Sequence, residues 1–121
     1  LLGLVAAIAP VIAAGNSAVV IASEKRPLPA ITLSEALATS DLPAGVLNIL
    51  TGKVSELAPW MASHMEIDGL DISGVDSKIE AELRVAGAEN LKRIHRFNKS
   101  PSPQRMLAFM ESKTVWHPIG V

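Results

Sequence analysis

The chain has 121 residues, of which 49% are hydrophobic, 19% are charged and none is cysteine. This length allows one domain, and the composition excludes a disordered tail and favours elements that are buried on both faces. The absence of cysteine excludes disulfides, cysteine-based zinc sites and a thiolate nucleophile from these residues. Because the formal net charge is −1 and there is no basic cluster, we expect no nucleic-acid partner.

The first 14 residues, "LLGLVAAIAPVIAA", are apolar and contain no basic residue. This stretch is too short to span a bilayer and has no basic start of the kind that signal peptides carry. We therefore expect a buried helix, no membrane association and a cytoplasmic location. Since the first residue is not Met, we also expect this chain to be a piece of something longer.

The beginning of the chain predicts a helix followed by a buried strand. Residues 2–14 have helical composition with a kink expected at Pro10, and Gly15 and Asn16 tolerate the left-handed conformation that ends helices. Residues 17–22, "SAVVIA", are β-branched and apolar throughout, which is typical of a central parallel strand.

The alternation of helix and short apolar strand continues to residue 97. It predicts strands at 46–50, 69–74 and 93–97 and helices at 30–40, 55–65 and 78–92, with Asp76 or Ser77 as the cap of the last helix. The fold class that follows is α/β: a partial doubly wound, Rossmann-like parallel sheet with helices on both faces. We expect one domain over residues 1–97, then residues 98–121 as a Pro/Ser linker, a short helix and an extended tail.

Ligands of parallel sheets bind at the carboxyl ends of the strands. Ser23 and Glu24 follow the first strand and supply a hydroxyl and a carboxylate able to bond the two hydroxyls of a ribose. Gly52 and Gly74 follow the second and third strands, where a glycine lets a phosphate approach the backbone. One glycine per turn is a weak signal, and ordinary tight turns remain the alternative.

Whole phrases of the chain, in order, carry a closer resemblance. "GNSAVVIASEKRPLP", "DLPAGVLNILTG", "ASHMEIDGLDISG" and "AGAENLKRI" resemble the cofactor-binding domain of the NAD(P)-dependent aldehyde dehydrogenase superfamily, over residues 1–95. "MLAFMESKTVW" is similar to the closing segment of that family, which implies an oligomerisation strand. The family's catalytic domain normally separates the two matches, and here only "HRFNKSPSPQ" stands between them.

The resemblance implies a cofactor site of NAD or NADP and assigns part of it to this chain. Glu24 matches the glutamate that partners the ribose hydroxyls, and Ser23 precedes it as in the family. Gly52 matches a glycine of the loop after the second strand. Ser73 and Gly74 are compatible with the family's turn after the third strand.

Other positions depart from the family pattern. Ile21 stands where the family has the lysine that contacts the ribose, Val54 and Ala58 stand at glycines, and Val75 stands at the phosphate-binding serine. The general-base glutamate falls near Phe97. Lost charge and added β-branched bulk disfavour a diphosphate, so we expect NAD(P) binding to be weak or lost.

We therefore expect a truncated, catalytically inactive aldehyde dehydrogenase-like protein with a structural or assembly role and no catalytic residue or metal site. Its expected partner is a second copy or a full-length relative, bound through the C-terminal tail. Two alternatives remain open: the C-terminal part of a longer aldehyde dehydrogenase-like chain, and a non-catalytic nucleotide-binding module that uses Glu24.

Overall fold

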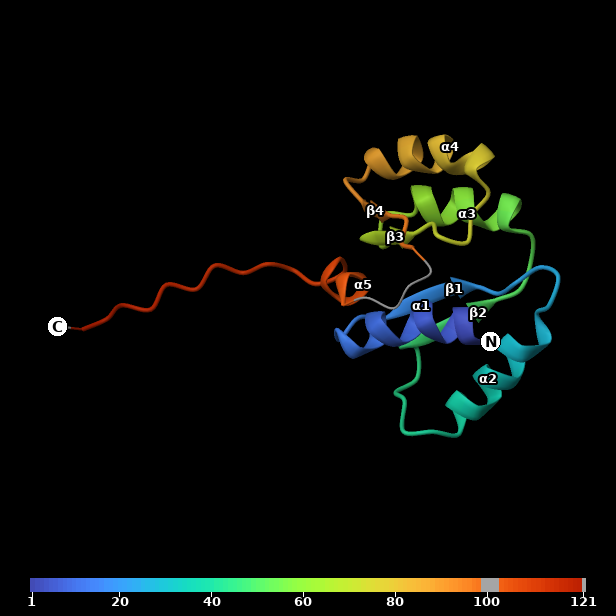
Figure 1. Cartoon of the computed structure of the whole chain (residues 1–121), viewed down its shortest axis with the longest axis horizontal. Coiled ribbons are helices and arrows are strands. Elements are labelled where there is room, and N and C mark those ends of the chain that lie inside the picture. The colour runs from blue at the N-terminus through green and yellow to red at the C-terminus, as the bar shows by residue number, and fades with distance from the viewer. Residues whose placement is uncertain (99–102, 121) are drawn as a thin grey trace.

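Five helices and four strands alternate along residues 1–98 and 103–120, the part of the chain that the computed structural model describes (Figure 1). In chain order they are α1 (Leu2–Ala13), β1 (Ala18–Ile21), α2 (Leu28–Ala38), β2 (Leu47–Leu50), α3 (Val54–Ser63), β3 (Gly69–Asp71), α4 (Ser77–Ala88), β4 (Arg93–His95) and α5 (Gln104–Leu107). The predicted order of helices and strands is confirmed.

The strands pair in parallel, as the α/β prediction requires. β1 pairs with β2 in the register Ala18↔Leu47 to Ile21↔Leu50, and β3 pairs with β4 in the register Gly69↔Arg93 to Asp71↔His95. The two ladders are separate, because no backbone hydrogen bond joins β1 to β3 in the described part of the chain. The expected single sheet is therefore divided into two pairs that side chains hold together.

The carboxyl end of α1 forms as its sequence predicts. Gly15 has a φ of +84°, and its N–H donates to the carbonyl of Ile12 at 2.9 Å. The amide Nδ2 of Asn16 donates to the carbonyls of Val11 and Phe109, at 3.3 and 3.1 Å. Asn16 thus ends the helix and also ties it to the segment that follows α5.

Pro10 explains a second tie between α1 and α5. A proline has no N–H, so the carbonyl four residues earlier, that of Ala6, loses its helical partner. The Nη1 of Arg105 donates to this carbonyl at 3.0 Å. A side chain from the far end of the chain therefore satisfies the acceptor that Pro10 leaves free.

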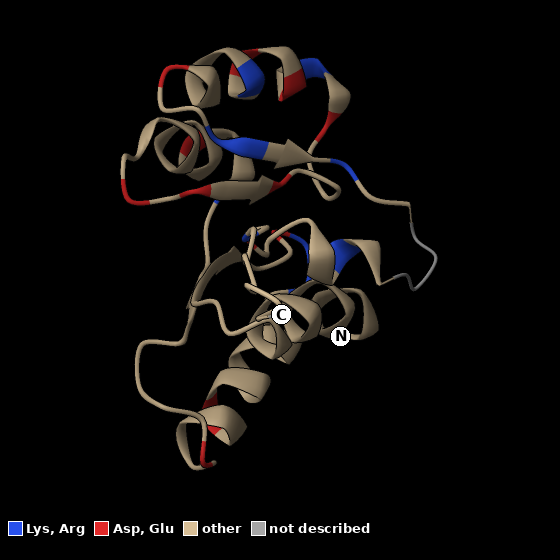
Figure 2. Ribbon diagram, turned by 90° about the vertical axis from the view of Figure 1, so that its left-hand side faces the viewer, with Lys and Arg blue, Asp and Glu red and all other residues tan. Residues whose placement is uncertain are grey.

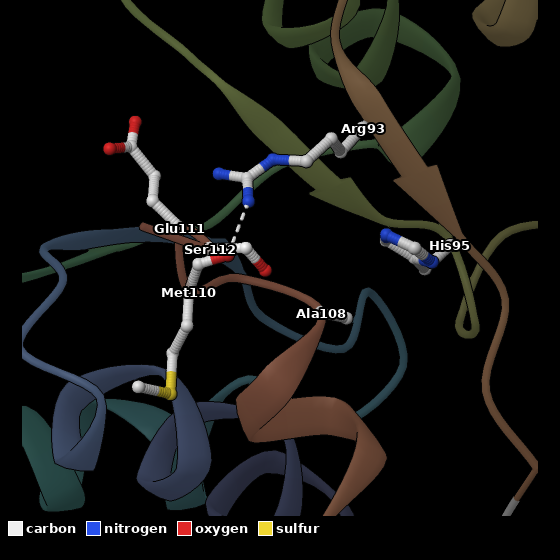
Figure 3. A pocket seen from close by; sticks show the side chains of 6 residues that line it. All are labelled: Arg93, His95, Ala108, Met110, Glu111 and Ser112. Atoms are coloured by element: carbon white, nitrogen blue, oxygen red, sulfur yellow. Dashed lines mark hydrogen bonds between the residues drawn. The ribbon is translucent and has the colours of Figure 1, made fainter. Parts of the chain in front are cut away.

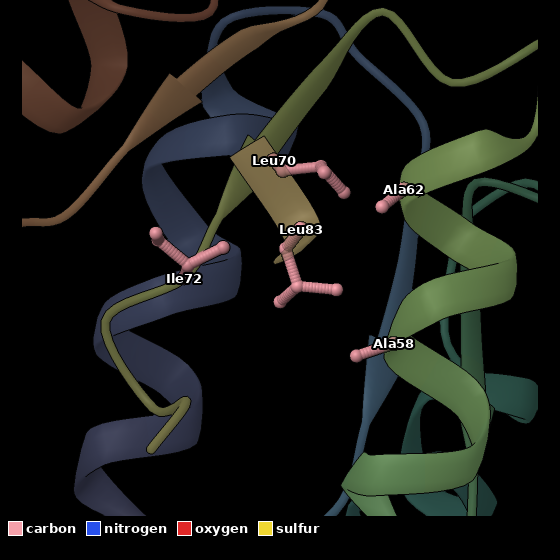
Figure 4. Close-up of a cluster of buried hydrophobic side chains, with 5 residues drawn as sticks. All are labelled: Ala58, Ala62, Leu70, Ile72 and Leu83. Carbon is pink, nitrogen blue, oxygen red and sulfur yellow. The ribbon is translucent and has the colours of Figure 1, made fainter. Parts of the chain in front are cut away.

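The hydrophobic core lies between α3, α4 and β3. It consists of Ala58, Ala62, Leu70, Ile72 and Leu83, and Figure 4 shows these side chains facing one another across the helix and the strand. The two alanines of α3 bring its backbone close to α4, with Leu83 filling the space between them. Of the predicted site residues, Ser23, Glu24 and Gly52 therefore follow the β1–β2 pair, and Ser73 and Gly74 follow β3, which borders this core.

α4 is shorter than predicted, and the residues after it explain why. Asp76 caps its start by accepting from the N–H of Lys78 at 3.0 Å, as predicted. The helix was expected to reach residue 92 but ends at Ala88, because Leu91 has a φ of 55°. This left-handed turn lets Asn90 and Lys92 donate to the last carbonyls of α3, those of Ser63 and His64.

The end of the chain forms a short helix and an extended tail, as predicted. α5 has only four residues, and residues 111–120 run away from the body without regular structure (Figure 1). Within this tail Trp116 is 88% exposed. Most of the predicted linker, residues 99–102, lies outside the described residues.

Candidate functional site at the carboxyl ends of the strands

Parallel pairing places the ends of β1 and β2 at one edge, where Ser23, Glu24 and Gly52 follow them. The Oε1 of Glu24 accepts a hydrogen bond from the backbone N–H of Val54 at 2.5 Å. Val54 is the first residue of α3, so the carboxylate caps that helix, where negative charge is favourable. The structure thus brings Glu24 to the turn that contains Gly52.

This contact changes what Glu24 can do for a ligand. The side chain is exposed, but one of its oxygens is bonded to the protein's own backbone. The bond from Val54 takes one of the roughly four acceptor sites of the carboxylate, so a ribose hydroxyl would share Glu24 with this N–H. Ser23 is also exposed and lies beside it in the chain.

Ser73 and Gly74 lie after β3, and the hydroxyl of Ser73 is engaged within the protein. It donates to the carboxylate of Asp71 in a short hydrogen bond and accepts from the backbone N–H of Phe97 at 2.8 Å. The Nη2 of Arg105 also approaches this oxygen, at 3.5 Å. One donor and two acceptor positions are the whole capacity of a hydroxyl, so Ser73 has none to spare.

Gly74 has open space beside it. A Cβ built there would meet no heavy atom within 4 Å. At Gly52 a Cβ would lie 2.9 Å from the Cδ1 of Leu57, which is the end of a movable side chain. Neither glycine is therefore held in place by a close approach of rigid backbone.

The positions that depart from the family pattern share one property. Ile21, Val54 and Val75 are partly buried and pack against the core cluster, and Ala58 belongs to that cluster. The side chains that replace a lysine, a glycine and a serine are thus used to cover hydrophobic surface. At the same edge Ser23, Glu24, Gly52 and Gly74 remain exposed.

An ion-pair network lies beside the start of α4. The guanidinium of Arg96, followed by that of Arg84, lowers the pKa of Glu80 by hydrogen bonding to its carboxylate. The Nη2 of Arg96 also donates to the carbonyl of Val75 at 3.1 Å. This network fixes the segment after β4 against the turn after β3.

Two cavities of the described part of the chain lie away from the predicted site. One, of about 550 Å³, is bordered by β4 and the start of the tail: Arg93, His95, Ala108, Met110, Glu111 and Ser112 (Figure 3). The other, of about 270 Å³, lies between α2 and β2. Neither is lined by Ser23, Glu24, Gly52, Ser73 or Gly74.

Sequence reasoning missed Arg105. Its Nε lies 3.2 Å from the Oδ2 of Asp71, both side chains are largely buried, and its guanidinium stacks over the ring of Phe97 at 4.9 Å. The one available signal was a single cation inside the apolar run "RMLAFM". Nothing in the sequence indicated which carboxylate it would meet, because Asp71 is far away along the chain.

Within residues 1–98 and 103–120, no group of three His, Asp or Glu side chains is placed to hold a metal ion. In the same ranges no helix has the length and apolarity that crossing a bilayer requires.

Comparison with known proteins identifies the family. The model of the aldehyde dehydrogenase family matches residues 1–96. The NADP/NAD-dependent aldehyde dehydrogenase PuuC of Escherichia coli (strain K12) is 39% identical over 85 residues, which is 70% of this chain and 17% of PuuC. An aldehyde dehydrogenase-like protein of Schizosaccharomyces pombe, C9E9.09c, is 31% identical over 116 residues, which is 94% of this chain and 23% of that protein.

The chain therefore spans about a fifth of the length of these curated relatives. No solved structure matches it. The family match covers both strand pairs, all five positions assigned to the cofactor, and Ile21, Val54, Ala58 and Val75. On this evidence the chain belongs to the aldehyde dehydrogenase family.

Proposed function

We propose that this chain is a non-catalytic member of the aldehyde dehydrogenase family, which keeps the cofactor-binding fold as a structural module. The observation that carries the proposal is the packing of Ile21, Val54 and Val75 against the core. A binding edge needs polar groups that face solvent, whereas these three side chains face the interior. The fold is retained while its contacts with a dinucleotide are replaced.

The substituted positions also weaken dinucleotide binding energetically. Losing one charge-assisted hydrogen bond, as isoleucine does at a lysine position, costs on the order of 1.5–3 kcal/mol of binding. Each 1.4 kcal/mol corresponds to about a tenfold change in affinity. Internal hydrogen bonds also occupy the hydroxyl of Ser73, whereas Glu24 keeps free acceptor sites beside its bond to Val54.

These residues lack the side chains that the family uses for catalysis. There is no cysteine to attack an aldehyde, and the family's general-base position falls near Phe97. Phe97 packs with His95 and Phe109, at ring distances of 5.5 and 6.1 Å, in an aromatic cluster. Incubation with NAD⁺ or NADP⁺ and simple aldehydes should give only background NAD(P)H, and turnover above that background would refute the proposal.

A second candidate is a nucleotide-binding module without catalysis, favoured by the exposure of Ser23 and Glu24. Thermal unfolding at millimolar NAD⁺ distinguishes the two, because a ligand that binds the folded state raises the unfolding temperature. Stabilisation that disappears in Glu24→Gln would favour the module. No shift in either chain supports the structural reading.

The structural role that we propose is assembly, in the cytoplasm, with a second copy or a full-length relative. The tail, residues 111–120, is extended, and Val115, Trp116 and Ile119 are exposed on it. β-branched and aromatic side chains in an extended segment suit addition to the edge of another sheet. Trp116→Glu should weaken such pairing in a pull-down with the relative, whereas Lys113→Glu, outside the apolar group, should weaken it less.

A further inference from the structure

Asp68 is followed by Gly69, and no other aspartate or asparagine of the chain precedes a glycine. The side-chain carboxyl of an aspartate is open to attack by the backbone nitrogen of the next residue, which closes a five-membered succinimide ring. A Cβ on that next residue hinders the closure, whereas glycine has none and its backbone is the most freely rotating. The pair at 68–69 therefore has the covalent structure that favours this reaction.

The loop that carries Asp68 leaves its side chain free. Residues 64–68 connect α3 to β3 and turn at one end of the β3–β4 pair, where acidic positions appear in red (Figure 2). Asp68 is exposed, and its carboxylate makes no hydrogen bond or ion pair with any residue that the structure describes. Since no partner holds it, the carboxyl is free to turn back toward the backbone that follows.

The backbone nitrogen of Gly69 is free as well. In the β3–β4 ladder the carbonyl of Asp68 accepts from the N–H of Arg93 at 3.0 Å, and the N–H of Ile72 donates to the carbonyl of His95 at 2.9 Å. Successive residues of a strand point their N–H groups to opposite sides, so that of Gly69 points away from β4. Among residues 1–98 and 103–120 it has no other acceptor, so ring closure breaks no hydrogen bond of this nitrogen.

The other aspartates lack this combination. Asp41 is also exposed, but the next N–H, that of Leu42, donates to the hydroxyl of Ser40 at 3.2 Å. Asp71 and Asp76 use their carboxylates to accept backbone hydrogen bonds, at 2.8 and 3.0 Å. Asp41 is therefore the internal reference for an exposed aspartate without a reactive neighbour.

We propose that Asp68–Gly69 is a site of spontaneous isoaspartate formation. The nitrogen of Gly69 bonds to Cγ of Asp68, and the carboxyl oxygen leaves as water. A second water then attacks the main-chain carbonyl carbon of Asp68, and the bond from this carbon to the nitrogen breaks. The chain now continues through Cγ, and the former carbonyl carbon becomes a free carboxylate. No oxidant, reductant or cofactor takes part.

The product changes the start of β3, because its backbone is one carbon longer there. The carbonyl that accepts from Arg93 becomes part of the free carboxylate and leaves the ladder. Gly69 also shifts beneath the ring of Phe109, whose nearest atoms lie only 2.9 Å from where a Cβ of Gly69 would be. Since Phe109 is 9% exposed and anchors the end of α5, we expect the modification to loosen residues 103–110.

The test incubates the 121-residue chain for several weeks at neutral pH and physiological temperature. A protein isoaspartyl methyltransferase then transfers labelled methyl groups from S-adenosylmethionine to isoaspartyl carboxylates, and peptide mapping locates the label. The peptide with Asp68 should carry at least about ten times more label than the peptide with Asp41, which corresponds to a barrier lower by about 1.4 kcal/mol.

Two variants at this exposed position separate the chemistry from local unfolding, with circular dichroism as the check on folding. Asp68→Glu keeps the charge but requires a six-membered ring, so its label should stay at background. Asp68→Asn should gain label faster than the wild type, because ammonia leaves the ring-closing step more readily than water. The proposal is overturned if Asp68 and Asp41 peptides are labelled equally, or if Asp68→Glu is labelled like the wild type.

Hydrogen exchange measures the consequence for the fold. Residues 103–110 should exchange faster in the aged wild type than in Asp68→Glu aged beside it. Equal exchange in the two samples would overturn the expected loosening of α5. Both measurements are made without a dinucleotide or a partner chain, so their outcome is independent of the function proposed above.

Discussion

At the scale of single residues, the link between α4 and β4 does more than connect them. Asn90 and Lys92 donate to the carbonyls of Ser63 and His64, so the link caps α3. Lys92 is 8% exposed, and its ammonium lies at the negative end of the α3 dipole. A buried cation is stabilised there by the same carbonyls that it satisfies.

Lys92→Met keeps the length of this side chain and removes its charge and its hydrogen bond. We expect the free energy of unfolding to fall by about 1.5–3 kcal/mol, the range for hydrogen bonds to charged groups. Urea denaturation measures this change. Lys53→Met, at an exposed position with one surface ion pair, should change stability by less than about 0.5 kcal/mol. Equal losses in the two variants would mean that the cap contributes nothing.

Leu91 sits between these two donors in the left-handed conformation, with 90% of its side chain exposed. The conformation costs a non-glycine residue roughly 1–2 kcal/mol, while glycine adopts it freely but loses more chain entropy on folding. Leu91→Gly should therefore leave stability unchanged or raise it by up to about 1 kcal/mol. Val85→Gly, in the middle of α4, should instead lower it by about 0.5–1 kcal/mol in the same denaturation experiment.

At the scale of elements, local signals predicted the helices and strands to within a few residues. Gly15 and Asn16 ended α1, and Asp76 capped α4, because each acts through its own backbone or the next turn. The overrun of α4 came from Leu91, a residue type that gives no sign of a left-handed turn. The division into two strand pairs was also not predictable, since it depends on which side chains lie between β1 and β3.

The candidate site was partly predictable for the same reason. Its residues could be located after the strands from sequence, and Glu24 does meet the turn that contains Gly52. Their partners could not be located, because Val54 and Phe97 reach Glu24 and Ser73 only through the tertiary fold. Arg105 was missed altogether, as its three contacts come from segments far apart in the chain.

The network at the start of α4 makes stability depend on pH. Arg96 and Arg84 hold the pKa of Glu80 below its ordinary value of 4.5 in the folded state. The carboxylate therefore contributes stability above that ordinary value, and this contribution is lost as the pH falls through the lower, folded-state pKa. Glu80→Gln should be less stable than the wild type at neutral pH, and the difference should shrink in acid.

Urea midpoints at about pH 7 and about pH 3 measure this change. The matched control is Glu82→Gln, two residues further along α4 at an exposed position. It should show no such dependence on pH. A difference between Glu80→Gln and wild type that stays constant across the two pH values would contradict the assignment.

At the scale of the whole molecule, Arg105 ties the two strand pairs together. It reaches the carbonyl of Ala6 in α1, beside the β1–β2 pair, and Asp71 at the end of β3. α5 has only four residues, and this side chain and the bond from Asn16 to Phe109 help to hold it. The C-terminal segment thus joins two halves that share no backbone ladder.

Arg105→Met should accordingly lower the free energy of unfolding by about 2–4 kcal/mol, since it leaves the largely buried Asp71 without its cation and with only the hydrogen bonds from Ser73. Arg84→Met breaks a more exposed pair on α4 and should cost less than about 1 kcal/mol. Hydrogen exchange should show faster exchange in residues 103–110 in the first variant only. Unchanged stability would mean that the two halves are joined without this contact.

We propose that hydrophobic packing at the ends of the strands has replaced contacts through which this family binds a dinucleotide. Isothermal titration of NAD⁺ into the chain tests it directly, at concentrations up to the millimolar range. Because Ile21, Val54 and Val75 cover hydrophobic surface where the family has polar or small residues, we expect no saturable heat. A saturable isotherm with a micromolar dissociation constant, abolished by Glu24→Ala, would contradict the claim.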